Sequence, residues 1–150
     1  MTEPVLADLE WTDPACPVAR TLDLVGDRWS LLIVRDAMDG ARAFRDFQQA
    51  TGIARNILTD RLRRLVSRGI LERAPGPSGR RHVYTLTPAG RDLFTVVVAL
   101  RQWGERHAFG PAEQHSVLVG DDGSPIPELR PTSSTGGPVD SESTSVRKVG

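Results

Sequence analysis

The sequence predicts a mainly α-helical fold with a small antiparallel β-hairpin. Two observations carry this expectation. Apolar residues recur at spacings of three and four in several segments between residues 17 and 107, and two short alternating segments flank a loop rich in proline and glycine. A length of 150 residues is sufficient for one domain with a hydrophobic core.

Helical spacing predicts two helices near the N-terminus. The first is expected over residues 17–25, where Val18, Leu22 and Val25 follow one another at spacings of four and three. The second is expected over residues 29–38. A glycine follows each of these segments and is typical of a helix end.

A helix-turn-helix is predicted next along the chain. A short helix that contains Phe44 and Phe47 ends at Gly52, and only Thr-Gly-Ile separates it from a longer helix over residues 54–69. The apolar residues of the longer helix form one stripe, consisting of Leu58, Leu62, Leu65 and Val66. Two helices joined by a short turn that contains glycine are typical of this motif.

The pattern then changes to a hairpin and a last helix. Residues 70–73 and 82–86 are predicted as strands, and the Pro- and Gly-rich loop between them as a hairpin turn. Thr87 is expected to cap a helix over residues 88–107, with Pro88 in its first turn. This order of elements predicts a winged helix-turn-helix, a fold that places its second motif helix in the major groove of DNA and its wing on the neighbouring backbone or minor groove.

Composition divides the chain into four parts. Residues 1–13 form an acidic N-terminal arm, and residues 14–109 form the predicted winged-helix domain. Residues 110–130 are a short extension with a candidate hairpin around Asp-Asp-Gly. Residues 131–150 are rich in Ser, Thr, Gly and Pro and are predicted to be disordered.

Charge is segregated along the chain, although the formal net charge is zero. Residues 41–91 contain 11 arginines and three acidic residues, a net charge of +8. The remainder carries 8 basic and 16 acidic residues. A polyanion would meet this basic middle segment, so the charge pattern favours a nucleic-acid partner.

Several classes of protein are not expected. No apolar run is long enough to span a membrane and the N-terminus does not resemble a signal peptide, so a cytoplasmic location is predicted. One cysteine and three scattered histidines predict no metal site. No nucleophile–base pair or phosphate-binding glycine motif indicates an enzyme, and no cofactor is expected.

The exposed face of the helix over residues 54–69 is the predicted DNA-reading surface. Arginine can bind guanine O6 and N7, asparagine can pair with adenine, and a threonine methyl can contact thymine. The first turn of such a helix usually approaches the bases. The candidates for groove contacts are therefore Arg55, Asn56, Thr59 and Arg63.

Other arginines are expected to contact phosphates. Arg61, Arg64 and Arg68 would hold the DNA backbone or pair with acids such as Asp60, four residues before Arg64. Further backbone candidates are Arg80 and Arg81 in the wing, together with Arg42 and Arg45 at the start of the short helix.

Cys16 has two interpretations. It precedes Pro17 and is expected at the N-cap of the first helix, where the helix dipole would stabilise a thiolate and make it reactive. The other interpretation is a small buried residue at the start of a helix that forms a dimer.

Several motifs, in order, resemble the HxlR-type winged-helix regulators of bacteria over residues 16–107. The most specific are GDRW at residues 26–29 and LTPAG at residues 86–90. The resemblance implies a dimeric DNA-binding transcriptional regulator, usually a repressor, whose N-terminal and last helices form the dimer interface. The implied interface residues are Val18, Leu22, Leu93, Val97, Leu100 and Trp103.

The leading hypothesis is a homodimer that binds a pseudo-palindromic double-stranded DNA operator in response to an unknown signal, such as a small-molecule effector. Some members of the family sense oxidants or quinones through a cysteine at the position of Cys16, so a thiol-based sensor on the same fold is one alternative. The other is a winged helix that binds proteins, which the exposed arginines oppose.

Overall fold

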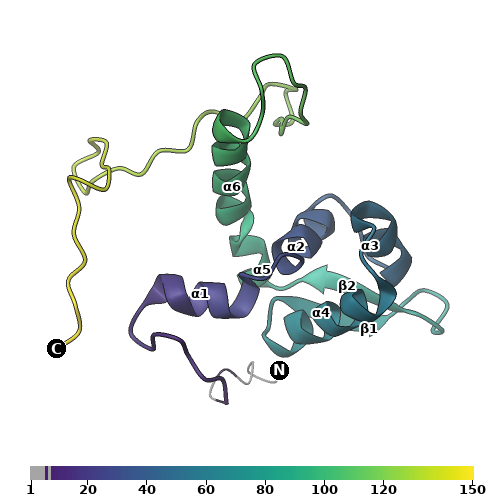
Figure 1. The fold of residues 1–150 in the computed structure, drawn as a ribbon. Coiled ribbons are helices and arrows are strands. Elements are labelled where there is room, and N and C mark those ends of the chain that lie inside the picture. Colours follow the sequence, from purple (N-terminus) through teal and green to yellow (C-terminus); the bar gives the residue numbers. More distant parts are fainter. Residues whose placement is uncertain (1–5, 7) are drawn as a thin grey trace. The chain divides into compact units, whose positions relative to one another are not determined.

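The computed structural model describes residue 6 and residues 8–150, which form two units, one ending at residue 97 and one beginning at residue 98. The helices are α1 (Pro17–Val25), α2 (Ser30–Met38), α3 (Phe44–Thr51), α4 (Arg55–Ser67), α5 (Pro88–Asp92) and α6 (Phe94–His107), and the strands are β1 (Leu71–Pro75) and β2 (His82–Leu86) (Figure 1). The predicted mainly helical fold with one small antiparallel sheet is confirmed. None of the described helices has the length and apolar character needed to cross a membrane.

The core of the first unit lies between α2, α3, α4 and the hairpin. Ile33 from α2, Phe47 from α3 and Leu62 from α4 are almost completely buried in it. Tyr84 of β2 packs edge-on against Phe47, with ring centroids 6.3 Å apart. The apolar stripe predicted for α4 is therefore the face that this helix buries.

Local capping fixes where the helices begin and end. Cys16 Sγ accepts a hydrogen bond from the Ala19 amide at 3.4 Å, and Thr87 Oγ1 accepts one from the Gly90 amide at 3.0 Å. The N-cap positions predicted for Cys16 and Thr87 are thus confirmed. In the helix-turn-helix, Gly52 ends α3 with φ of 68°, a left-handed conformation that favours glycine.

The hairpin pairs β1 with β2 in antiparallel register, from Leu71 opposite Leu86 to Pro75 opposite His82. The loop before α3 also joins this sheet, because the Tyr84 amide donates to the Arg42 carbonyl at 2.7 Å. This contact ties the start of α3 to the wing.

The single helix predicted over residues 88–107 is wrong, since the chain forms two helices, α5 and α6. Leu93 ends α5, and its amide donates to Gly90 three residues back, which tightens the last turn. Gly90 lies so close to the carbonyl of Ile70 that a Cβ would stand 2.2 Å from that oxygen. The break between α5 and α6 thus occurs where α5 packs closely against the start of the hairpin.

The second unit contains most of α6 and the C-terminal segment. Arg101 and Gln102 of α6 hold residues 116–129 by hydrogen bonds to backbone groups. Val119 and Pro125 form an isolated β-bridge, in agreement with the hairpin expected there. The segment 131–150 has no helix or strand, but a second bridge between Thr132 and Pro138 closes a turn in it.

The described part of the N-terminal arm lies along α1. Both the amide and the hydroxyl of Thr12 donate to Asp23, at 2.9 and 2.8 Å. Arg20 stacks over the Trp11 ring, 4.5 Å from its centroid. Residues 1–5 and 7 of the predicted acidic arm lie outside the described residues.

Candidate nucleic-acid interface

The face of α4 opposite the core is open to solvent. Leu58, Leu62 and Leu65 bury one side of the helix, and its helical period of 3.6 residues sends the intervening side chains outward. The exposed positions include all the DNA candidates of this helix, namely Arg55, Asn56, Thr59, Arg63 and Arg64.

An open groove of about 670 Å³ lies between α3, the first turn of α4 and β2. It brings Arg55 and Thr59 of α4 together with Arg81 of the wing and Arg45 of α3. Among the residues that the structure describes, no aspartate or glutamate lines it. The Arg55 guanidinium lies over the Phe44 ring, 5.0 Å from the centroid, a cation–π contact that orients the side chain.

Three further polar residues of the groove were not predicted as site residues: Gln48, His82 and Tyr84. Helical spacing could have indicated Gln48, because it lies three residues after Arg45 on α3. Strand alternation places His82 and Tyr84 on the same face of β2. Their approach to α4, however, follows from tertiary packing.

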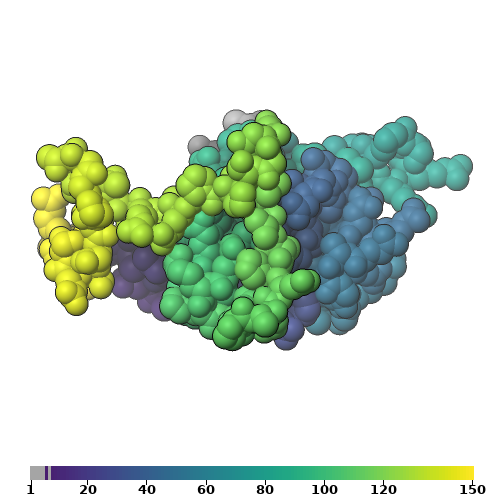
Figure 2. All heavy atoms as spheres, turned by 90° about the horizontal axis from the view of Figure 1, so that it is seen from above, coloured from purple at the N-terminus to yellow at the C-terminus, as the bar shows by residue number. Residues whose placement is uncertain are grey.

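The wing carries Arg80 and Arg81 at its exposed loop. Figure 2 shows this teal hairpin loop projecting beyond the neighbouring blue helix α3. Arg81 lines the groove and Arg80 does not. A projecting, positively charged loop beside an exposed helix face is suited to contacts with phosphates.

Asp60 forms ion pairs with three arginines of α4. It lies 3.1 Å from Arg63 and 3.0 Å from Arg64, and it also pairs with Arg61. The pair of Arg64 with Asp60 agrees with one of the two alternatives expected for Arg64, while its contact with DNA stays a prediction. Burial acts to raise the pKa of Asp60, but hydrogen bonds and charge from the arginines outweigh it and lower that pKa.

Arg61 and Arg68 are held by the protein itself. Arg61 Nε lies 2.8 Å from Asp27, which also accepts hydrogen bonds from the amides of Trp29 and Ser30 at the start of α2. Arg68 Nη1 donates to the Leu24 carbonyl at 2.8 Å. These arginines join α4 to the segment around α1 and α2 rather than face the groove.

Arg42 is also held internally. Its Nη1 atom donates to the carbonyls of Ala37 and Ala41, at 2.9 and 2.8 Å. The structure therefore places Arg42 at the end of α2 and outside the groove that contains Arg45 and Arg55.

Apolar side chains remain exposed on α1 and on α6. In α1, Val18 and Leu22 are 68% and 60% exposed. In α6, Leu100 and Trp103 are 54% and 61% exposed. Leu93 differs from these candidates because it packs against the core of the first unit, and Val97 is half-buried.

Cys16 is half-buried, and its Sγ atom accepts the hydrogen bond of the Ala19 amide. Within residue 6 and residues 8–150, no group of three His, Cys, Asp or Glu side chains is placed to hold a metal ion.

Proteins with sequences similar to this chain are described as transcriptional regulators. MT3179 of Mycobacterium tuberculosis, described as an uncharacterized HTH-type transcriptional regulator, is 50% identical over 91 residues. That match covers 60% of this chain and 58% of the relative, so the chain spans little more than half of that protein.

Solved structures agree in fold. The crystal structure of PA1607, described as a candidate transcription factor, has a TM-score of 0.86 and 48% identity, covering 89% of this chain and 94% of that one. HypR in its oxidized form, described as a redox regulator, has a TM-score of 0.54 and 34% identity, covering 61% and 97%. These relatives are regulators rather than enzymes.

A family model described as HxlR-like helix-turn-helix matches residues 24–110, which include α2 to α6 and the hairpin. The match contains the whole groove and every arginine that lines it. The resemblance predicted from GDRW and LTPAG is confirmed, and the chain belongs to the HxlR-like helix-turn-helix family.

Proposed function

We propose that this protein is a transcriptional repressor that binds a pseudo-palindromic operator as a homodimer. One observation carries the proposal: Arg45, Arg55 and Arg81 line one groove beside the exposed face of α4, and no carboxylate of the described residues lines it with them. The descriptions of the relatives as transcriptional regulators support it. The protein would act in the cytoplasm, where bacterial DNA lies.

In the proposed complex, α4 enters the major groove. Arg55, Asn56 and Thr59 lie in its first turns and would contact base edges, together with Arg63 one turn later. The wing would lie on the adjacent backbone or minor groove, with Arg81 at phosphates. Arg45 of α3 joins these phosphate contacts because it lines the same groove.

The exposed apolar residues of α1 and α6 support a dimer. Burial of Val18, Leu22, Leu100 and Trp103 in a shared interface would remove them from water. Two copies of α4 would then read half-sites about 10 base pairs apart, or a multiple of that distance. Sedimentation equilibrium of the intact chain and of Trp103→Glu tests this arrangement, because the variant should shift the population to monomers. A native chain that stays monomeric at tens of micromolar would contradict it.

DNA binding is tested directly by mobility shift with the fragment upstream of the protein's own gene and with a genomic fragment library. We expect specific binding that weakens steeply with salt, because each phosphate contact releases counterions. Arg55→Ala should impair binding to the selected site, whereas Arg73→Ala, on the exposed part of β1 outside the groove, serves as the matched control. Failure to bind any fragment at low salt would refute the proposal.

A second candidate function, thiol-based sensing, is favoured by the capping contact of Cys16. Its Sγ atom accepts a hydrogen bond from the Ala19 amide at the start of α1, and the structure resembles HypR, described as a redox regulator. Two protomers could join their Cys16 residues as a disulfide when an oxidant removes two electrons and two protons. Non-reducing electrophoresis after diamide treatment, with Cys16→Ser as control, should show a dimer band. An unchanged monomer band with undiminished DNA binding would exclude this function.

A further inference from the structure

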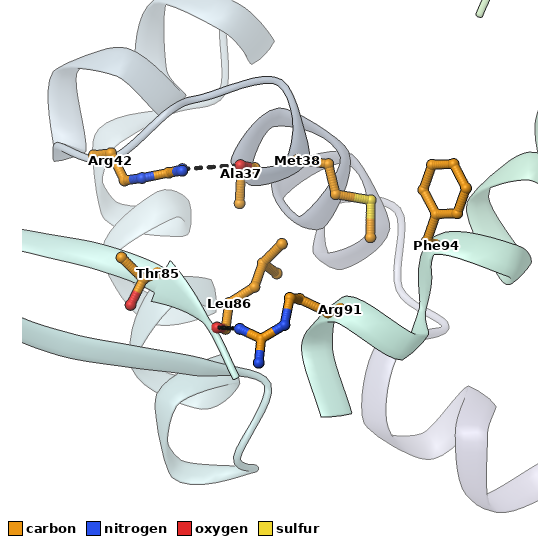
Figure 3. A pocket seen from close by; sticks show the side chains of 7 residues that line it. All are labelled: Ala37, Met38, Arg42, Thr85, Leu86, Arg91 and Phe94. Atoms are coloured by element: carbon orange, nitrogen blue, oxygen red, sulfur yellow. Dashed lines mark hydrogen bonds between the residues drawn. The ribbon is translucent and has the colours of Figure 1, made fainter. Parts of the chain in front are cut away.

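A second cavity of the first unit, with a volume of about 470 Å³, lies between the end of α2, the end of β2, α5 and the first residue of α6 (Figure 3). Its apolar wall consists of Ala37, Met38, Leu86 and Phe94. Phe94 is 46% exposed, an unusual state for a phenylalanine beside a core. The volume is in the range of pockets that bind small organic molecules.

Two arginines, Arg42 and Arg91, and Thr85 of β2 supply the polar groups that line this pocket. Arg42 donates through Nη1 to the Ala37 and Ala41 carbonyls, and Arg91 donates through Nη1 to the Leu86 carbonyl at 2.9 Å. Figure 3 shows both guanidiniums held against the backbone in this way. Their positions are therefore fixed before any ligand arrives.

The remaining donors of these arginines are available. Over the described residues, neither Nε nor Nη2 of Arg42 or Arg91 makes a hydrogen bond or an ion pair. Within residue 6 and residues 8–150, no aspartate or glutamate lines the pocket. The two preorganised guanidiniums could consequently donate charge-assisted hydrogen bonds to an anion. An apolar group attached to that anion could pack against Met38, Leu86 and Phe94.

The pocket and the DNA groove share two chain segments. Arg42 lines the pocket, whereas Ala43, Phe44 and Arg45 line the groove. In β2, Thr85 and Leu86 line the pocket, whereas His82 and Tyr84 line the groove. The two segments are joined by the hydrogen bond from the Tyr84 amide to the Arg42 carbonyl. The pocket is therefore connected to the groove through both segments.

From these observations we infer that the pocket is an effector site for a small organic carboxylate with an aromatic or branched apolar body. The carboxylate binds Arg42 and Arg91, and the apolar body displaces water from Phe94 and Met38. An occupied pocket favours a position of the segment 42–45 in which Arg45 no longer contacts DNA, which lowers the affinity for DNA. The regulatory half of this inference rests on the proposed DNA-binding function, whereas the binding half does not.

The binding half is tested with 1-naphthoate as the probe and its neutral analogue 1-naphthamide as the control. In amide-resolved NMR titrations of the full chain, naphthoate should cause saturable shifts at Met38, Leu86 and Arg91. Naphthamide should bind at least about tenfold more weakly, because it lacks the charge-assisted hydrogen bonds. Equal affinity for the two probes, or shifts confined to other regions, would overturn the inference.

Two matched variants locate the site. Arg91 is exposed and, among the described residues, its side chain makes one hydrogen bond, to a backbone carbonyl, so Arg91→Gln should keep the fold, which the same spectra report. We expect Arg91→Gln to lower the affinity for naphthoate at least about tenfold. Arg73→Gln removes the same charge from a residue that does not line the pocket, and should stay within about twofold of the native chain. A native-like affinity in Arg91→Gln would contradict the assignment.

The regulatory half is measured by fluorescence anisotropy with the DNA fragment selected above. Saturating naphthoate should weaken DNA binding by about fivefold or more in the native chain, and should have no such effect in Arg91→Gln. Binding of naphthoate without any change in DNA affinity would overturn the coupling but support the pocket. A chain that binds naphthoate and no DNA would overturn the proposed function and the coupling together, again with the pocket supported.

Discussion

The arginines of α4 fall into two groups with opposite surroundings. Arg55 and Arg63 lie on the outward face, and the Arg63 side chain is 74% exposed. Arg61 is 20% exposed and pairs with Asp27, whereas Arg68 donates to a carbonyl of the α1 segment. The same residue type therefore serves two purposes within one helix, and its partners rather than its charge decide between surface recognition and attachment to the core.

The largest effect on stability is expected at Arg61. Arg61→Met should lower the free energy of unfolding by about 2–3 kcal/mol, because it leaves the half-buried carboxylates of Asp27 and Asp60 without their shared partner. The matched change Arg63→Met removes only an exposed pair and should cost less than about 0.5 kcal/mol. Urea denaturation followed by circular dichroism compares the two. Equal losses would show that the two groups do not differ in stability.

Arg55 should show the converse behaviour. Arg55→Ala should weaken the specific DNA site by about 10- to 100-fold, corresponding to about 1–3 kcal/mol. It should change the unfolding free energy by at most about 1 kcal/mol, because the Arg55 side chain is exposed and its contact in the protein is a cation–π contact with Phe44. Anisotropy titrations against specific and scrambled duplexes measure the difference, with Arg73→Ala as control. A comparable loss on both duplexes would place Arg55 at phosphates instead of bases.

The wing arginines should have a smaller, sequence-independent effect. Arg80→Gln and Arg81→Gln should each weaken specific and scrambled DNA to the same extent, because phosphate contacts carry no base information. Each should reduce the slope of log K against log salt by about one. Arg81 lines the groove and Arg80 does not. If the two losses of DNA affinity differ, the loss caused by Arg81→Gln should therefore be the larger one. A slope that stays unchanged in both variants would remove the wing from the interface.

The order of elements could be predicted because helical spacing and turn residues are local signals. The caps at Cys16 and Thr87 were predictable for the same reason. The break at Leu93 was not, because the apolar spacing continues through it. The close approach of Gly90 to the Ile70 carbonyl that goes with this break joins residues 20 positions apart, which periodicity does not report.

The sequence could predict which positions of α4 belong to the site, but it could not predict which residues of other elements lie beside them. The stripe of leucines indicated the outward face, and a spacing of four indicated the pair Arg64–Asp60. The pair Arg61–Asp27 spans 34 positions, and the groove combines α3, α4 and β2. Such contacts depend on how the elements pack, so a sequence read segment by segment could not assign Arg61 to the core or add His82 and Tyr84 to the groove.

The smallest expected effect is on how the free energy of unfolding falls at acid pH. This effect should also differ between the two groups of arginines. Burial acts to raise the pKa of Asp27, but hydrogen bonds from Ser30 and Arg61 lower it below its ordinary value. A carboxyl whose pKa is lower in the folded chain stabilises it above the unfolded pKa, and this contribution disappears as the pH falls through the folded pKa. Asp36 opposes this trend, because burial raises its pKa and protonation then favours the folded state.

We therefore expect the native chain to lose more unfolding free energy than Arg61→Met between about pH 5 and pH 2, since the variant has already lost the attraction that lowers the pKa of Asp27. Arg63→Met should follow the native chain more closely, because Asp27 keeps its partner in that variant. Thermal unfolding at a series of pH values measures all three. If the curve of Arg61→Met ran parallel to the native curve, the Asp27–Arg61 pair would not be the contact that fixes α4, and the distinction between the two groups of arginines would be one of exposure alone.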